Sequence, residues 1–306
     1  MRFCPLSPLP NDKSNSSGVT NPLEAFNLHF STEAAVRLIS FRGRVLEFEF
    51  FGQVFESCCA FSYFDDFVKM LEESTGIAYS ILEVSITGGN AQSHYAVKII
   101  KMDFLDEIRS AIKKVEATVK KRLEDFEITG KEERLLFNEM CFCILTANFT
   151  AEGGVRIQEQ IGDGFSSLTQ RDLAGKLKSL RHRFPTSRAS YICENRFLYG
   201  SLNGALSQFK DGWTAREWLV KTVKGFGYKE ASHFLRNVGF TDVAIIDRHI
   251  LKYLKEMGLI EMPKTFNRKR YLEMEKILIA IAKKLNLNLA ELDLYLWYIM
   301  TGKILK

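Results

Sequence analysis

The hydrophobic pattern of the chain changes its period near residue 102. Before that point, apolar and polar side chains alternate in short stretches, as in "RVLEFEF", where Leu46, Phe48 and Phe50 share one face. "AYSILEVSI" and "SHYAVKII" are also typical of strands, and the "TGGNAQ" between them is rich in turn residues. "FDDFVKMLEES" has helical spacing. We therefore predict a small antiparallel β-sheet with a helix over residues 23–101.

Residues 102–306 show helical periodicity almost throughout. "DFLDEIRSAIKKVEATVKKRLEDF" carries apolar residues at three- and four-residue spacing, and Asp103 is a candidate N-cap. After "EITGKEE", the stretch "RLLFNEMCFCILTANF" predicts an apolar helix, and further helices follow with short breaks. The fold class is thus α+β, with a larger all-α domain after the sheet. We expect residues 1–22 to be a disordered tail.

The composition of the chain limits the class of protein and its cellular setting. The chain of 306 residues is 46% hydrophobic and 26% charged, which is typical of a globular protein. No apolar run approaches the ~18 residues of a membrane span, and the N-terminus lacks the apolar core of a secretory signal. Six cysteines occur without a CxxC pair, which favours a reduced setting: Cys4, Cys58, Cys59, Cys141, Cys143 and Cys193. We expect a cytoplasmic or other intracellular protein with no membrane partner.

A glycine-bracketed turn, "KGFGYKEASH", interrupts two predicted helices. "REWLVKTV" precedes it, and "YKEASHFLRNV" resumes the helix as far as Gly239, which suits a C-terminal cap. Gly225 and Gly227 would let the backbone approach a phosphate, and the free N–H groups of the second helix would face it. The net charge of +5 mildly favours such an anionic partner. Helix–helix turns often contain glycine for packing alone, so the motif by itself is weak.

Two residues near this turn can carry chemistry. Lys229 falls in the first turn of the second helix, where the positive end of the helix dipole favours a neutral amine, the form needed for covalent catalysis. Asp247, in "DVAIIDRHILKYL", follows an apolar pair and precedes a helix, so it is a candidate N-cap. The alternatives are a solvated surface lysine and a purely structural cap. Together, an amine and a fixed carboxylate beside a phosphate-binding turn suit attack at a sugar carbon.

Longer motifs around these residues resemble a known family. "CFCILTANFTAEGG", "GFGYKEASHFLRNVG", "DVAIIDRHIL" and "ELDLYLWYIMTGKILK" are similar to the archaeal-type (type 2) 8-oxoguanine DNA glycosylase/AP lyases of the helix-hairpin-helix superfamily. The resemblance covers about residues 103–306, so the helical domain is expected to be a helix-hairpin-helix glycosylase domain. It implies excision of 8-oxoguanine from double-stranded DNA, followed by β-elimination through a lysine imine.

The resemblance also implies roles for individual residues. Lys229 matches the Schiff-base lysine and Asp247 the essential aspartate. Phe184 and Trp297 match positions that sandwich the flipped base, although core packing is the usual role of such side chains. Lys306 matches a lysine that helps to distinguish 8-oxoguanine from guanine, through its ammonium group or its main-chain oxygen atoms.

Other polar residues are weaker candidates for DNA contact. Asn148 resembles the residue that related glycosylases insert where the base was, and a helix-end asparagine is the alternative. Arg248 and His249, and similarly His182 and Arg183, are candidates for DNA phosphate contact or for exposed helix positions. The histidines show no metal-ligand spacing, so we expect no catalytic metal and no cofactor.

Three functional hypotheses remain at this point. The first is a monomeric, bifunctional 8-oxoguanine glycosylase/AP lyase. The second keeps the fold and changes the damaged base. The third is a non-catalytic helix-hairpin-helix DNA-binding module. Type 2 enzymes are little more than the helical domain, so residues 1–101 are an addition, and "FFGQVF" is similar to the N-terminal β domain of eukaryotic-type enzymes.

Overall fold

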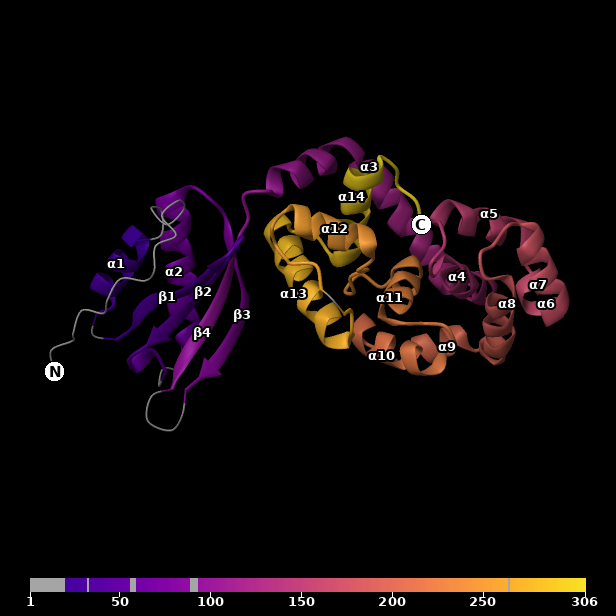
Figure 1. Ribbon diagram of the computed structural model, residues 1–306, viewed down its shortest axis with the longest axis horizontal. Helices are drawn as coiled ribbons and strands as arrows, with labels where there is room; N and C mark the ends of the chain where they lie inside the picture. The colour runs from indigo at the N-terminus through magenta and orange to yellow at the C-terminus, as the bar shows by residue number, and fades with distance from the viewer. Residues whose placement is uncertain (1–19, 32, 56–58, 89–92, 264) are drawn as a thin grey trace. The chain divides into compact units, whose positions relative to one another are not determined.

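The computed structural model describes residues 20–31, 33–55, 59–88, 93–263 and 265–306 (Figure 1). The chain divides into two compact units, Met1–Asp103 and Phe104–Lys306, which we call unit 1 and unit 2. The predicted tail lies mostly outside the described residues, and the first helix begins within its last part, at Thr20.

Unit 1 contains an antiparallel β-sheet, as predicted. Its strands are β1 (Ala35–Arg42), β2 (Val45–Phe51), β3 (Tyr79–Thr87) and β4 (His94–Lys101), arranged in the order β1-β2-β4-β3. Phe48 of β2 pairs with Val97 of β4, and both are fully buried. Strand β1 was not predicted. Its alternation is broken by a register shift between Leu38 and Ser40.

Helices α1 (Thr20–His29) and α2 (Ala60–Thr75) complete unit 1, with a short 3₁₀ turn, η1 (Gln53–Phe55), after β2. Phe67 of α2 lies 4.9 Å, centroid to centroid, from Phe48 of the sheet and 5.4 Å from Phe26 of α1. Edge-to-face packing of these rings gives unit 1 a core of its own.

Unit 2 is mostly helical and contains no strand among its described residues, as predicted. Its elements are α3 (Leu105–Lys131), α4 (Glu133–Thr146), α5 (Ala151–Ile161), α6 (Gly164–Ser167), α7 (Gln170–Ser179), α8 (Pro185–Glu194), η2 (Asn195–Leu198), α9 (Leu202–Leu206), α10 (Gly212–Thr222), α11 (Tyr228–Asn237), α12 (Arg248–Glu256), α13 (Arg268–Leu285) and α14 (Leu289–Thr301).

The prediction that Asp103 caps α3 is wrong. The N-cap position is Phe104, and no side chain caps this end. Asp103 instead accepts a hydrogen bond of 2.5 Å from Nε of Arg44, and Lys101 lies 3.6 Å away. Partial burial opposes the charged form, but Arg44 and Lys101 outweigh it and leave the pKa of Asp103 lowered. The Asp103 carboxylate therefore forms an ion pair with Arg44, which is distant in the sequence, and does not cap the helix as predicted.

Helix α4 runs through the centre of unit 2. Every side chain from Met140 to Leu145 is fully buried, so this part of the helix is apolar on all sides. Helix α3 continues into the predicted break and ends within it, at Lys131. Its Gly130 lies against the end of α11: a β-carbon there would be 2.1 Å from the carbonyl oxygen of Val238. Only glycine permits this approach of the two backbones.

The described cysteines and helices agree with the sequence-based limits. Cys141, Cys143 and Cys193 are free thiols. Among the described residues, no helix is both long enough and apolar enough to cross a membrane.

Candidate active site

The glycine turn has the predicted helix–turn–helix geometry. Helix α10 ends at Thr222, α11 begins at Tyr228, and Gly239 follows α11 with a φ of +99°. Gly225 has a φ of +93°, and a β-carbon there would lie 2.7 Å from Cδ2 of Tyr191. Both conformation and space therefore demand glycine at this position. Gly227 is the N-cap of α11, and its N–H donates to the carboxylate of Glu230 at 3.2 Å.

Lys229 lies in the first turn of α11, as the sequence predicts. Asp247 is the N-cap of α12, and its Oδ1 accepts hydrogen bonds from the N–H groups of His249 at 2.8 Å and Ile250 at 3.0 Å. This confirms the predicted cap. One carboxylate oxygen is thereby fixed by the backbone, while the other carries no hydrogen bond among the described residues.

A cleft of about 750 Å³ brings these residues together. It is formed within unit 2 by α11, α12 and α14, the segment after α4, and residues 303–306. Eight of the candidate residues named from the sequence line it: Lys229, Asp247, Trp297, Lys306, Asn148, Arg183, Arg248 and His249. Residues far apart in the sequence thus share one concave surface, which is the usual form of a ligand site.

The lysines that line the cleft differ in their partners. Lys303 Nζ lies 2.5 Å from a carboxylate oxygen of Glu152. Lys306 Nζ donates to Glu139 at 2.8 Å and to Gln158 at 2.6 Å. Lys229 forms no ion pair or hydrogen bond through its amine within the described part of the chain. Its amine is therefore available to a ligand in the cleft.

Aromatic groups line one part of the cleft. His249 and Trp297 meet edge to face, with ring centroids 5.1 Å apart and an interplanar angle of 75°. The indole N–H of Trp297 is buried and has no hydrogen-bond partner among the described residues. A planar ligand with polar edges would suit these surroundings.

Three residues of the cleft escaped the sequence analysis. Asp293 of α14 forms an ion pair with Arg236 of α11. Burial raises the pKa of Asp293 to about 6 against the opposing charge of Arg236, and the charge of Asp247 raises it further. Burial also lowers the pKa of His233 well below its usual value, and Lys229 adds to this, so the imidazole is neutral. His233 and Asp293 lie one turn from Lys229 and Trp297 respectively, and that spacing was the available signal.

Other predicted site residues lie outside the cleft lining. Phe184 is the N-cap residue of α8, and its ring is 36% exposed beneath the guanidinium group of Arg183, 5.0 Å from the ring centroid. Arg183 does line the cleft, whereas Gly225 and Gly227 do not.

The two roles considered for His182 are both wrong. This side chain is only 4% exposed, and its Nε2 lies 3.0 Å from the carbonyl oxygen of Leu145. Burial lowers its pKa, so the ring is a neutral internal group that ties the segment before α8 to α4.

Asn148 lies just beyond α4, with a φ of +59° and an exposed side chain that lines the cleft. Asparagine tolerates this conformation better than most residues. Arg248 is exposed at the start of α12 and also lines the cleft. In the described part of the chain, no cluster of His, Cys, Asp and Glu could hold a metal ion.

Comparisons with known proteins identify the family. The sequence model of the 8-oxoguanine DNA glycosylase family matches residues 119–287. The 8-oxoguanine DNA glycosylase/AP lyase of Methanocaldococcus jannaschii is 51% identical over 204 residues, which are 66% of this chain and 97% of the relative. That of Korarchaeum cryptofilum is 52% identical over 202 residues, with 66% and 96% covered.

The solved structures agree. The crystal structure of the M. jannaschii glycosylase/lyase in complex with a 15mer DNA containing 8-oxoguanine matches with a TM-score of 0.65 and 50% identity, covering 67% of this chain and 100% of that one. The glycosylase of Thermotoga maritima matches with a TM-score of 0.63 and 45% identity, covering 67% and 99%. At these identities and coverages, the chain belongs to the 8-oxoguanine DNA glycosylase family.

Proposed function

We propose that this chain excises 8-oxoguanine from double-stranded DNA and cleaves the strand, with Lys229 as the nucleophile. The observation that carries the assignment is the meeting of an uncommitted amine on α11 with a capped carboxylate on α12 in one cleft. Relatives at 51% and 52% identity are named 8-oxoguanine DNA glycosylase/AP lyases. The target nucleotide must leave the base stack, because C1′ is otherwise inaccessible.

The chemistry follows from the amine. Nζ of Lys229 attacks C1′, the C1′–N9 bond breaks, and the leaving base takes the bonding electrons and a proton. The amine loses a proton and the sugar ring opens, which leaves a protonated imine between Lys229 and C1′. The imine acidifies C2′–H. Loss of that proton forms a C2′–C3′ double bond and expels the 3′ phosphate.

Asp247 stabilises the positive charge on the sugar and forms no covalent bond with it. As the C1′–N9 bond breaks, positive charge develops on the sugar, and a carboxylate fixed beforehand by the His249 and Ile250 N–H groups stabilises it without reorganising. Because Asp247 is held by the backbone, its position relative to the start of α12 is constant through the reaction.

Base discrimination is assigned to the main chain of Lys306 rather than to its ammonium group. Glu139 and Gln158 already hold that ammonium group. Main-chain oxygen atoms accept hydrogen bonds, and 8-oxoguanine donates at N7 where guanine accepts. Guanine would leave such an acceptor unpaired, a penalty of about 1–3 kcal/mol. The indole of Trp297 offers a surface on which the flipped base can stack.

Exposed cations near the cleft suit the phosphate backbone. Arg248 lines the cleft at the start of α12, Lys303 lies near the N-terminus of α5, and Gly225 lies in the turn that leads into α11. These groups position the duplex, whereas the base contacts set the specificity. The protein is proposed to act as a monomer, since all of these groups belong to one chain.

Borohydride trapping tests the nucleophile. The full chain is mixed with a duplex carrying one 8-oxoguanine, and with an undamaged duplex, in the presence of borohydride. Wild type should give a covalent adduct with the lesion only, mapped by peptide mass to Lys229. Lys229→Gln should give none while still binding the duplex. Lys224→Gln is the matched control, because Lys224 lies in the same turn but does not line the cleft. Wild-type trapping by Lys229→Gln would reject the assignment.

Asp247→Asn separates charge from helix capping. Asparagine caps helices about as well as aspartate, so α12 should remain intact. We expect wild-type thermal stability and a fall in the excision rate of about 100-fold or more, as for loss of a transition-state electrostatic contact. An unchanged rate would restrict Asp247 to a structural role.

A further inference from the structure

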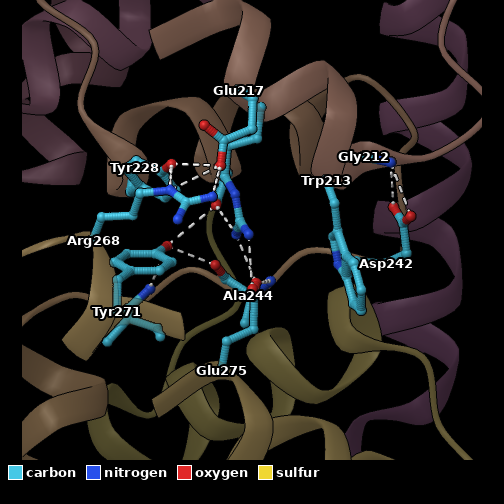
Figure 2. A network of polar contacts seen from close by, with 12 residues as sticks. Gly212, Trp213, Glu217, Tyr228, Asp242, Ala244, Arg268, Tyr271 and Glu275 are labelled. Atoms are coloured by element: carbon cyan, nitrogen blue, oxygen red, sulfur yellow. Dashed lines mark hydrogen bonds and ion pairs between the residues drawn. The ribbon is translucent and has the colours of Figure 1, made fainter. Parts of the chain in front are cut away.

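The segment Asp242–Ile246, which leads into Asp247, has no regular secondary structure but is held at alternate residues. We call it the connecting segment. Asp242 accepts the N–H of Gly212 with both carboxylate oxygens, at 2.8 and 3.0 Å, and its carbonyl accepts the indole N–H of Trp213 at 2.5 Å. Figure 2 shows this contact beside the start of α10.

The middle of the connecting segment is held by α13. The N–H of Ala244 donates to Oε1 of Glu275 at 2.9 Å. The carbonyl of Ala244 accepts the hydroxyl of Tyr271 at 2.7 Å, and the N–H of Ile246 donates to the same hydroxyl oxygen at 3.2 Å. Tyr271 thus contacts the residue that immediately precedes Asp247.

The hydroxyl of Tyr271 also reaches the helix that carries Lys229. Oγ of Ser232, on α11, lies 3.1 Å from it. Ser232 lies three residues after Lys229, close to one helical turn along α11. One oxygen atom therefore connects the residue before Asp247 with a residue one turn beyond Lys229.

A buried ion pair supports this connection. Arg216 of α10 donates to both carboxylate oxygens of Glu275, at 2.6 and 2.7 Å, and to Oγ of Ser232 at 3.2 Å. Tyr271 itself is 2% exposed, and burial raises its pKa well above the usual value, so the phenol keeps the proton that it donates. Ser232 and Ala244 thus hold the Tyr271 hydroxyl in one arrangement, while the buried Nε of Arg216 has no hydrogen-bond partner among the described residues.

We propose that Tyr271 is a positioning residue that sets the spacing of Lys229 and Asp247 through the Ser232 and Ile246 contacts of its hydroxyl group. The proposal rests on the proposed roles of Lys229 and Asp247. Tyr271 does not line the cleft and touches no reacting atom. Its effect is therefore on the rate of the covalent step and not on DNA binding, because small misplacements of reacting groups lower rates steeply.

Single-turnover borohydride trapping of the full chain on 8-oxoguanine duplex tests this with two readouts. The amplitude reports the fraction of competent protein, and the rate reports the geometry of the site. Tyr271→Phe keeps the ring and removes the hydroxyl group. We expect its rate to fall about 10- to 100-fold with near wild-type amplitude and unchanged duplex affinity. A purely structural role would lower the amplitude or the melting temperature and leave the rate unchanged, which would overturn the proposal.

Two further variants sharpen the test. Ser232→Ala removes the α11 contact of the Tyr271 hydroxyl, together with the Arg216 contact to the same oxygen, and keeps the Ile246 contact. It should therefore slow trapping less than Tyr271→Phe, and the double variant should be close in rate to Tyr271→Phe alone. Arg268→Gln is the matched control, since Arg268 is on the same helix and, among the described residues, its side chain forms hydrogen bonds with Glu217 and Tyr228 and none with Tyr271. Its rate should match wild type. Additive losses in the double variant would contradict a shared hydroxyl, whereas wild-type trapping by Lys229→Gln would instead reject the nucleophile.

Discussion

The ammonium group of Lys306 lies 2.8 Å from a carboxylate oxygen of Glu139, a residue on the central helix of unit 2 that is 2% exposed. Asn237 donates to the other oxygen of Glu139 at 2.6 Å, and Gln158 contacts the same carboxylate at 3.2 Å. Residues 303–306 are therefore anchored in the interior, at the cleft where base recognition is proposed.

Removing this anchor should destabilise the protein. Lys306→Met leaves Glu139 buried without its cation, and breaking a fully buried pair costs about 3–5 kcal/mol. The Lys306 side chain is 28% exposed, so we expect a smaller loss, about 2 kcal/mol. Urea denaturation measures it. Lys303→Met is the control, because its pair with Glu152 is exposed and should matter little. Equal losses in the two variants would contradict the buried anchor.

The contact between Gly130 and Val238 predicts opposite effects for two alanine substitutions. Gly130→Ala would place a methyl group against the Val238 carbonyl and force α3 away from α11, so we expect a loss of about 1–3 kcal/mol or more. Gly175→Ala, in the exposed middle of α7, meets no atom within 4 Å and should stabilise by about 0.5–1 kcal/mol. Denaturant midpoints of the two variants should therefore move in opposite directions, and a shared direction would contradict the packing.

Asp293 predicts a dependence of stability on pH. Its pKa is about 6 in the folded protein, against about 3.9 for an unfolded aspartate. Between these values the folded state keeps a proton that the unfolded state has lost. The contribution of Asp293 is thus fully present below about pH 4 and is lost as pH rises through about 6, by about 2–3 kcal/mol. The free energy of unfolding of wild type and Asp293→Asn, measured in urea from pH 4 to 7, isolates the contribution of Asp293. If it changes equally with pH in both proteins, the prediction is wrong.

Unit 2 should work without unit 1. The relatives align over nearly their whole length with about two thirds of this chain, and the family match lies within unit 2. We expect a fragment of residues 102–306 to fold and to trap 8-oxoguanine DNA at a rate close to that of the full chain. Circular dichroism checks its folding. A folded fragment that fails to trap the damaged DNA would show that unit 1 contributes part of the site. If binding by the fragment depends less on salt concentration than binding by the full chain, unit 1 contributes phosphate contacts.

The sequence correctly predicted features that depend on neighbouring residues, such as turns and helix caps. The positions of Lys229 in the first turn of α11 and of Asp247 as a cap were confirmed, because turns and caps depend on neighbouring residues. Strand β1 was missed because its bulge disrupts the alternation, and Val36 is its one buried residue.

Tertiary contacts account for the rest. Asp103 pairs with Arg44, which is 59 residues away, and His182 contacts Leu145, which is 37 residues away. In both cases a distant partner outweighed the local preference. The ion pair of Asp293 with Arg236 and that of Glu139 with Lys306 span 57 and 167 residues. No short-range spacing rule could have found them.

The burial of the C-terminal half of α4 also allows its native thiols to report when unit 2 opens. Cys141 and Cys143 lie on this helix with no exposed surface, and burial raises the pKa of both thiols well above the usual value. An alkylating reagent can reach them only when the centre of unit 2 opens, whereas Cys59 in unit 1 is exposed. The alkylation rate of these native thiols therefore measures how often the catalytic unit unfolds, free or bound to damaged DNA, without any engineered probe.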